Sequence, residues 1–296
     1  MKTFSISDKA FDWNFSVEEN LKRIRAAGFT HLHFAYKWTK PEALTAAERA
    51  EWERALDTTG MKIQDVHGCH PRDIDLWSEG KAERDQALAL LADRIELTRT
   101  LGGDAVVYHV PWRGEVTREE IDFLLEGLAA LEETARETGV KIAMENHYVA
   151  ENDRRTLEAV FERFPEDYIG FTFDPGHALI SGNSAWLMAH CAPRLEILHL
   201  NDNDARSDLH WNPFDPEGQA DWEAIAAFIH RSAYVKALQL EVSWTPERHG
   251  THEAFLAAAF AAATRISDDV SAIKGASRNG CMPISGETGP QREDSL

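Results

Sequence analysis

The sequence predicts a single-domain (β/α)8 barrel, the TIM barrel fold. Eight short runs of apolar or β-branched residues alternate with eight longer segments of helical periodicity, which is the element count of that fold. One junction recurs three times, in GFTHLHF, GMKIQDV and GVKIAME, where a glycine ends a helix and the chain re-enters a strand. The alternative is an open doubly wound sheet, which usually has a glycine-rich turn after its first strand. Here the first strand leads into DKAFDW, which favours the barrel.

The predicted strands are short runs rich in Val, Ile, Leu, Phe and Thr, which suit a pleated and buried surface. Most of them follow a turn residue or a helix stop. In chain order their ranges are Thr3–Ser7, Thr30–Phe34, Lys62–Val66, Ala105–Val110, Lys141–Glu145, Ile169–Phe173, Leu195–Leu200 and Ala237–Val242.

The predicted helices lie between these strands and carry apolar residues at three- and four-residue spacing. Their ranges are Val17–Ala27, Glu42–Thr59, Lys81–Leu101, Thr117–Thr138, Asp153–Phe164, Asn183–Cys191, Asp221–Arg231 and His252–Ile266. Four of them stop at a glycine suited to the left-handed cap, at positions 28, 60, 102 and 139. Thr117 and Glu120 form a capping box at the start of the fourth helix.

The composition is typical of a soluble globular enzyme. The 296 residues are 43% hydrophobic and 27% charged, with a formal net charge of −19, and they hold enough apolar material for a sizeable core. No stretch approaches the ~18 apolar residues of a membrane span, and the acidic N-terminus does not fit a signal peptide. Three cysteines provide no disulfide framework, which fits a reducing cytoplasm. We expect a barrel over residues 1–266 and a flexible tail over residues 267–296, which are rich in Ser, Gly and Asp.

Histidines and carboxylates gather at the ends of the predicted strands. Six consecutive strands, from the third to the eighth, carry one at or just past the carboxyl end, where TIM barrels place their active sites. These residues are Asp65, His67, His109, Glu145, His147, Asp174, His177, His199 and Glu241, with Asp208 and His210 in the loop after the seventh strand. Each one alone has a structural explanation, as a satisfied polar residue or an ion-pair partner.

Together these groups would repel or desolvate one another in one apical space. A bound cation resolves that conflict, because it binds deprotonated carboxylates and neutral imidazoles. Mixed shells of His, Asp and Glu suit zinc, manganese or iron rather than calcium. The cluster therefore predicts a divalent metal site at the carboxyl end of the barrel.

Several segments carry a resemblance to a known superfamily. They are LGGDAVVYH at 101–109, IAMEN at 142–146, FDPGH at 173–177, LHLNDNDARSDLHWNPFDPEGQADW at 198–222, and the pair at 240–241. Over about residues 1–266 the sequence resembles the xylose isomerase-like TIM barrels, which include sugar phosphate isomerases/epimerases and endonuclease IV-type apurinic-site nucleases. The most specific match follows the seventh strand, where the family pattern is His, Asp-Asn, Asp-x-His and a Gly before Asp-Trp. It is found here as His199, Asp202-Asn203, Asp208-Leu209-His210, Gly218 and Asp221-Trp222.

The sugar-epimerase members imply one divalent ion (Mn, Zn, Mg, Co or Fe) on Glu145, Asp174, His199 and Glu241. The resemblance also implies that Glu145 and Glu241 act as paired acid and base, and that His177 and Arg206 contact the substrate. An ion on adjacent substrate oxygens would acidify the neighbouring C–H and stabilise an enediolate. Trp112 is a further candidate substrate contact, because it follows a strand end and indole packs against sugar rings. The implied activity is isomerisation or epimerisation of a sugar, sugar phosphate or polyol.

The endonuclease-type members imply more ligands, and the chemical types match at nine positions. These positions are His67, His109, Glu145, Asp174, His177, His199, Asp208, His210 and Glu241. The fuller set would hold two or three ions, so a hydrolase or lyase acting on a small molecule is the alternative. A third hypothesis is a binding barrel without catalysis. The net charge of −19 and the acidic loop after the seventh strand argue against nucleic acid as a partner. We expect a small carbohydrate-like substrate, no membrane association, and barrel helices that would allow a homo-oligomer.

Overall fold

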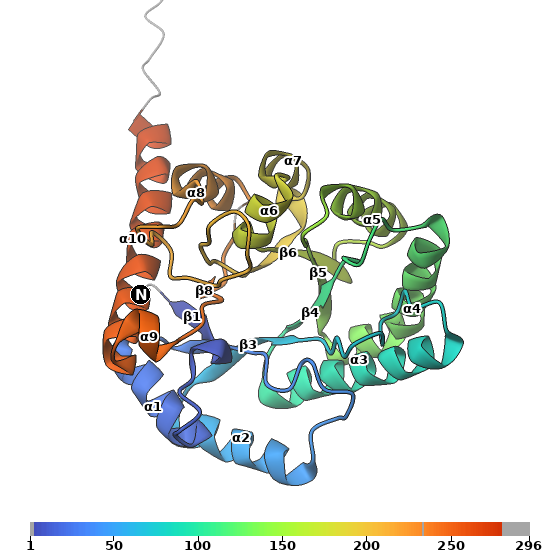
Figure 1. The fold of residues 1–296 in the computed structure, drawn as a ribbon, viewed down its shortest axis with the longest axis horizontal. Helices are drawn as coiled ribbons and strands as arrows, with labels where there is room; N and C mark the ends of the chain where they lie inside the picture. The colour runs from blue at the N-terminus through green and yellow to red at the C-terminus, as the bar shows by residue number, and fades with distance from the viewer. Residues whose placement is uncertain (1–2, 233, 280–296) are drawn as a thin grey trace, which may run out of the picture.

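Eight parallel strands form a barrel at the centre of the molecule, and the longer helices surround it (Figure 1). The computed structural model describes residues 3–232 and 234–279. The strands are β1 (Phe4–Ser7), β2 (His31–Phe34), β3 (Lys62–His67), β4 (Ala105–His109), β5 (Lys141–Glu145), β6 (Ile169–Phe173), β7 (Leu195–Leu198) and β8 (Leu238–Leu240). Neighbours in chain order pair in parallel from β1 to β7, and β1 also pairs with β8. The predicted TIM barrel is confirmed.

The barrel closes between β7 and β8 through a short contact. Leu200, two residues past β7, forms an isolated parallel bridge with Leu240. The N–H of Leu200 donates to the carbonyl of Gln239 at 3.0 Å, and its carbonyl accepts from the N–H of Glu241 at 3.1 Å. The predicted seventh and eighth strands, 195–200 and 237–242, are longer than β7 and β8, because only this bridge pairs the two at the seam.

The helices follow the strands in alternation. They are α1 (Val17–Ala27), α2 (Ala46–Thr59), α3 (Lys81–Leu101), α4 (Arg118–Thr138), α5 (Ala150–Arg163), α6 (Pro175–Ser181), α7 (Ser184–His190), α8 (Trp222–Arg231), α9 (Pro246–His249) and α10 (His252–Asn279), with the 3-10 helices η1 (Asp8–Ala10) and η2 (Ala192–Arg194). The four predicted glycine stops are all left-handed caps, and the capping box of Thr117 and Glu120 is present. Over the described ranges, no helix is long and apolar enough to cross a membrane.

Two helix starts differ from the prediction by three residues or more, and a short helix between predicted elements is new. Helix α2 begins at Ala46 rather than at Glu42, because Thr45 caps it and forms a capping box with Glu48. Helix α5 begins at Ala150, three residues before the predicted Asp153. The short helix α6 was not predicted; Asp174 caps it and a proline occupies its first turn.

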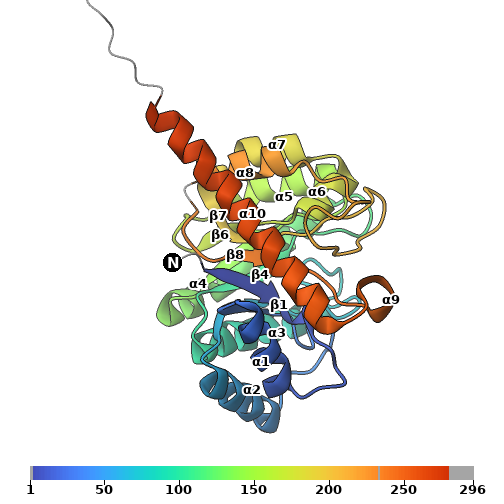
Figure 2. The same cartoon turned by 90° about the vertical axis from the view of Figure 1, so that its left-hand side faces the viewer.

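Helix α10 is longer than predicted. The sequence was expected to leave helical structure after Ile266, but α10 continues to Asn279. Val270, one turn past Ile266, packs against the core, and Oγ of Ser271 donates to the carbonyl of Ser267 at 2.7 Å. The apolar stripe therefore extends into the predicted tail, and Figure 2 shows this helix projecting beyond the barrel. Residues 280–296 of that predicted tail lie outside the described residues.

Alternation along the strands directs one set of side chains outward and another set into the barrel. Outward residues such as Val106 and Tyr108 belong to the large core shared with the helices. A separate small apolar cluster consists of Ala105, Val107, Ala143 and Ile197. Because alternate residues of a strand share a face, His109, Glu145 and His199 are the next inward positions. The fold therefore places these polar residues above a plug of small apolar side chains.

Candidate metal centre

Glu145, Asp174, His199 and Glu241 converge at the carboxyl ends of β5 to β8. Each offers one oxygen or nitrogen atom within 4.8 Å of those of the other three, and all four residues are buried. Nδ1 of His199 is 2.9 Å from Oε1 of Glu145 and 3.3 Å from Oε2 of Glu241. The structure thus brings together the four residues that the sequence predicts as ligands of one ion.

Neighbouring residues fix Asp174 in place. Its Oδ1 accepts a hydrogen bond from the N–H of His177 at 2.8 Å, and its Oδ2 accepts one from Nδ2 of Asn201 at 2.8 Å. The side chain of Asn146 bonds to both the N–H and the carbonyl of Asp174. A Cβ at Gly176 would lie 2.1 Å from Oδ1 of Asn201, so only glycine lets helix α6 approach this closely. Asp174 is therefore both a candidate ligand and a helix cap.

The sequence match beyond β7 includes a structural support for the site. Oδ2 of Asp202 accepts from Nε1 of Trp222 at 2.9 Å, and its Oδ1 accepts from the N–H of Ala220 at 3.0 Å. A Cβ at Gly218 would lie 2.3 Å from the carboxyl group of Asp202. Asp202, Gly218 and Trp222 thereby pin the β7–α8 loop that carries Asp208.

Three histidines share one orientation. Nδ1 of His67, His177 and His210 lies 2.8, 2.9 and 3.0 Å respectively from a backbone carbonyl oxygen. A carbonyl only accepts, so each Nδ1 carries a proton and the neutral ring keeps its lone pair on Nε2. Metal-binding histidines are commonly held this way, with one nitrogen donating to a carbonyl and the other facing the ion.

A second group of ligand types lies beside the first. Nε2 of His210 is 3.0 Å and Nε2 of His177 is 3.5 Å from Oδ2 of Asp208. Tyr148 donates its hydroxyl proton to the same oxygen at 2.8 Å. The ligand atoms of the two histidines and Asp208 lie within 4.8 Å of one another, as the fuller predicted set requires.

A third group surrounds the other oxygen of Glu145. Its Oε2 lies 3.1 Å from Nε2 of His109 and 3.9 Å from Nε2 of His67. His70 is also near, but its Nε2 accepts from the N–H of His109 and its Nδ1 bonds to Asp75 at 2.9 Å. Both nitrogens of His70 are therefore occupied, and we assign it a structural role.

The donor set fits a divalent ion. Oε2 of Glu145 is buried and has no hydrogen-bond partner, and the same holds for Oδ1 of Asp208. Buried carboxylate oxygens without partners are costly unless a cation neutralises them. Carboxylates and imidazole nitrogens are the ligands that zinc and manganese take.

Burial and mutual charge set the ionisation of these groups. Burial lowers the pKa values of His67, His109 and His147 well below the ordinary value, and neighbouring histidines lower them further. Burial opposes ionisation of Glu145, but the charge of His199 outweighs it and holds the pKa at about 2. These three neutral imidazoles and the ionised Glu145 are in the forms that bind metal. Neighbouring carboxylates outweigh burial at His177 and His199 and raise their pKa values, so an ion bound there would displace a proton.

A cavity of about 40 Å³ opens at this cluster, lined by seven of the nine predicted ligand positions together with Lys9, Trp38, His147 and Tyr148. Lys9 and Tyr148 were not predicted from the sequence as part of the site. Lys9 lies two residues past the end of β1, so the strand-end criterion would have included it. That criterion was applied to histidines and carboxylates, which are ligand types, and a lysine is not one.

The two other predicted substrate contacts lie off the cavity lining. Arg206 is exposed on the loop between β7 and α8. Trp112 stacks on His147, with ring centroids 4.9 Å apart, and makes a T-shaped contact with His109 at 5.3 Å, and both of these histidines line the cavity. Their roles in substrate binding stay predictions.

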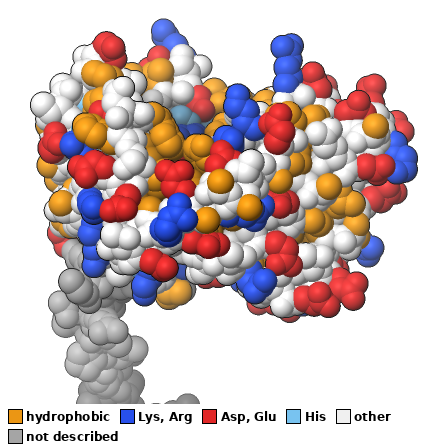
Figure 3. Space-filling model, turned by 90° about the horizontal axis from the view of Figure 1, so that it is seen from below, with side chains coloured by type: hydrophobic (Ala, Val, Ile, Leu, Met, Phe, Trp, Pro, Cys, Tyr) orange, Lys and Arg blue, Asp and Glu red, His pale blue; other side chains and the backbone are white. Residues whose placement is uncertain are grey.

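The exterior carries charges of both signs. Figure 3 shows acidic and basic side chains interspersed on one side of the molecule, with a histidine visible in a hollow near its upper edge. Nucleic-acid sites gather Lys and Arg into continuous patches. The surface in this view has the mixed character expected from the composition, and the exclusion of nucleic acid stays a prediction.

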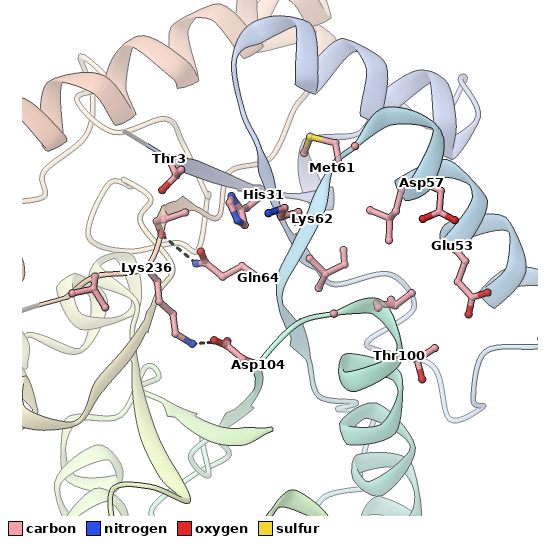
Figure 4. Close-up of a pocket in the computed structure, with 17 residues that line it drawn as sticks. Thr3, His31, Glu53, Asp57, Met61, Lys62, Gln64, Thr100, Asp104 and Lys236 are labelled. Atoms are coloured by element: carbon pink, nitrogen blue, oxygen red, sulfur yellow. Dashed lines mark hydrogen bonds and ion pairs between the residues drawn. The ribbon is translucent and has the colours of Figure 1, made fainter. Parts of the chain in front are cut away.

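A larger cavity, about 1050 Å³, lies at the opposite end of the barrel (Figure 4). It is lined by residues that precede or begin strands, among them His31, Lys62 and Lys236. Lys236 is paired with Asp104 and Glu196. Because TIM barrels carry their chemistry at the carboxyl ends of the strands, we place the functional site at the smaller cavity.

Comparison with known proteins agrees with this geometry. Residues 21–261 match the family model described as Xylose isomerase-like TIM barrel. The chain belongs to this family. The y4fM protein of Sinorhizobium fredii, named as uncharacterized, is 28% identical over 252 residues, which cover 76% of this chain and 80% of that protein.

Solved structures of similar fold include an epimerase and a zinc-containing protein. An L-ribulose 3-epimerase superposes with a TM-score of 0.76 at 19% identity, covering 97% of this chain and 100% of that one. The IolI protein with a zinc atom superposes with a TM-score of 0.71 at 17% identity, covering 92% and 99%. At these identities the likeness shows the shared barrel fold.

Proposed function

We propose that this protein is a metal-dependent isomerase or epimerase of a sugar, sugar phosphate or polyol. The observation that carries the proposal is the convergence of Glu145, Asp174, His199 and Glu241 within 4.8 Å. The family membership supports it, as do the similar folds of an epimerase and of a zinc-containing protein. Those proteins' substrates and metals are extended to this chain only as a proposal.

The four residues would hold one divalent ion, which would polarise substrate oxygens and acidify the neighbouring C–H. Glu145 comes from β5 and Glu241 follows β8, so two carboxylates approach the centre from separate strands. One can remove a proton from carbon while the other returns one to the opposite face. Lys9 donates to Oε1 of Glu241 at 2.8 Å and leaves Oε2 facing His199.

The cavity must widen to admit a sugar. Its volume of about 40 Å³ is far below the roughly 300–1,000 Å³ of typical ligand pockets. Most lining residues are buried, whereas Trp38 and Tyr148 are half-buried and form part of its open side. Rotation of these two side chains would admit substrate, and their return would exclude water from the two glutamates.

Solvent-hydrogen exchange tests the proposal. The protein loaded with Mn²⁺ or Zn²⁺ is incubated in D₂O with a panel of ketoses and ketose phosphates, and deuterium next to the carbonyl is followed by NMR. We expect exchange with one member, and Glu241→Gln should slow it about 10²–10⁴-fold, the usual contribution of a general base. Glu247→Gln, at an exposed glutamate of α9, is the matched control. Full metal content and activity in both Glu145→Ala and Glu241→Ala would overturn the assignment.

The second candidate is a hydrolase or lyase with two or three ions. The groups around His109 and around Asp208 favour it, because they supply ligand types beyond the first centre. Elemental analysis separates the two functions: about one ion per chain supports the isomerase, and two or three zinc ions support the hydrolase.

A further inference from the structure

Lys9 lies inside the cluster of candidate ligands. Oγ of Ser7 accepts a hydrogen bond from the backbone N–H of Lys9 at 3.1 Å, which fixes the turn after β1. Its ammonium nitrogen is 2.8 Å from Oε1 of Glu241 and 3.1 Å from Nε2 of His210. It also lies 5.6 Å from the ring centre of Trp38, within cation–π range. Among the described residues that line the cavity, Lys9 alone is a Lys or Arg.

Nε2 of His210 can bind either the Lys9 ammonium group or a metal ion, but not both at once. Its Nδ1 proton is donated to the backbone carbonyl of Glu241 at 3.0 Å, so the lone pair of the neutral ring is on Nε2. An ammonium group only donates, and Lys9 therefore uses that lone pair. A metal ion on His210 would need the same lone pair.

The charges around His210 also exclude a metal ion from this point while Lys9 is present. Oδ2 of Asp208 is 3.0 Å from Nε2 of His210, so two acceptor atoms face each other. A positive charge beside them relieves the repulsion, and Lys9 already provides one. A metal ion at this point would meet the ammonium group at short range and be repelled.

We propose that Lys9 stands in for a metal ion at the group formed by His177, Asp208 and His210 and keeps that group free of metal. The inference rests on the proposed metal centre of Glu145 and limits the number of ions that the site can bind. The chain would hold one ion fewer than its ligand types allow, and a three-metal hydrolytic site could not form while Lys9 is in place.

Counting bound ions in the full chain tests this. Metal-free wild type and Lys9→Met are loaded with Zn²⁺ and, separately, with Mn²⁺, then dialysed and analysed for metal per chain. We expect Lys9→Met to bind one more ion than wild type. Adding His210→Ala to Lys9→Met should remove that ion, whereas His210→Ala alone should leave the wild-type count unchanged.

Two controls accompany the count. Lys62→Met removes the same charge from an exposed residue at the start of β3 and should bind as wild type does. Circular dichroism and thermal melting show whether Lys9→Met folds, and Lys9→Gln serves as a second neutral variant.

Equal counts in wild type and both neutral Lys9 variants would overturn the inference, as would loss of an ion from wild type on His210→Ala alone. Failure of the proposed function is a separate result. In that case wild type would bind no ion that Glu145→Ala removes, whatever the Lys9 variants show.

Discussion

Asp65 lies behind the metal-ligand candidates and orients two histidines. Its Oδ2 bonds to Nδ1 of His33 at 2.5 Å and lies 3.9 Å from Nε2 of His199. Burial would raise the pKa of Asp65, but the charges and hydrogen bonds of these histidines lower it to about 2. An ionised carboxylate on this side favours a proton on Nε2 of His199, which leaves Nδ1 for the centre.

Asp65→Asn should therefore weaken metal binding about 10–100-fold, as outer-shell substitutions commonly do. The measurement is a dissociation constant from competition with a chelator. Asp75→Asn is the matched control, because Asp75 is equally buried and bonds to His70, whose nitrogens are both occupied. Equal losses in the two variants would show that Asp65 acts only through general stability.

At the residue scale, strand-end positions could be predicted and loop positions could not. His109, Glu145 and His199 follow the two-residue alternation of their strands, which the sequence shows directly. Arg206 lies in a loop, where no period connects the residue type to a direction. Lys9 lies just past β1, where a search limited to histidines and carboxylates does not select it. Lys9 lies in η1, which follows β1 directly, and its ammonium nitrogen is 2.8 Å from Oε1 of Glu241, whereas Arg206 is exposed on its loop.

Helix α6 depends on a residue with two roles. Asp174 accepts the N–H of His177 as the helix cap and also accepts a hydrogen bond from Asn201 on its other oxygen. Burial raises its pKa to about 6, and the charge of Glu145 also disfavours ionisation. Capping needs only an acceptor, whereas an ion needs the negative charge.

Two substitutions of Asp174 should separate these roles. Asp174→Asn keeps an acceptor for the cap, whereas Asp174→Ala removes it at a cost of about 0.5–2 kcal/mol. In urea unfolding without metal, we expect Asp174→Ala to be less stable than Asp174→Asn by that amount. Both variants should lose metal binding. Equal stabilities would contradict the capping role.

Helix α5 is held against the end of β5 by Asp153. This buried carboxylate accepts one hydrogen bond from the backbone N–H of His147 at 2.8 Å and another from Nδ2 of Asn183 at 3.3 Å. Burial nevertheless raises its pKa from 3.8 to about 7. The folded protein thus binds this proton more tightly than the unfolded chain. The resulting stability is complete below about pH 3.8 and is lost as the pH rises through about 7.

Asp153→Asn should accordingly stabilise the protein at pH 8 by a few kcal/mol, at ~1.4 kcal/mol per pKa unit, and by much less at pH 4.5. Urea unfolding of metal-free protein at the two pH values measures the difference. Asp57→Asn, on an exposed position of α2, should change the free energy of unfolding by the same amount at both pH values. A gain for Asp153→Asn that does not depend on pH would contradict the role of burial.

At the element scale, helix ends could be predicted where a capping residue marks them. The glycine stops and the Thr117 capping box predicted helix ends correctly, because a cap depends only on residues close in sequence. The start of α2 was missed because Thr45, rather than the first periodic residue, caps it. The length of α10 was missed because its last turns depend on Val270 packing against the barrel, a tertiary contact that periodicity alone does not show.

At the scale of the whole molecule, the alternation of eight strands with helices was sufficient to predict the barrel, because few topologies bury so many parallel strands. The excess of acidic residues has a partly local cause. Of the charges that give −19, Glu145, Asp174, Asp208 and Glu241 belong to the candidate centre. Their mutual repulsion is a cost to the metal-free fold that the sequence shows only once these residues are placed together.

Metal binding should therefore stabilise the entire barrel, because the ligands come from strands on both sides of the closing seam. An ion at about 1,000 times its dissociation constant adds ~4 kcal/mol to the free energy of unfolding. For a domain of this size that is a rise in melting temperature on the order of 10 °C. Calorimetry with Mn²⁺ or Zn²⁺, and with a chelator, measures it. The rise should shrink toward pH 5, where protons compete for the ligands, and should vanish in Glu145→Ala. An unchanged melting temperature in wild type with and without the ion would contradict a metal centre that spans these strands.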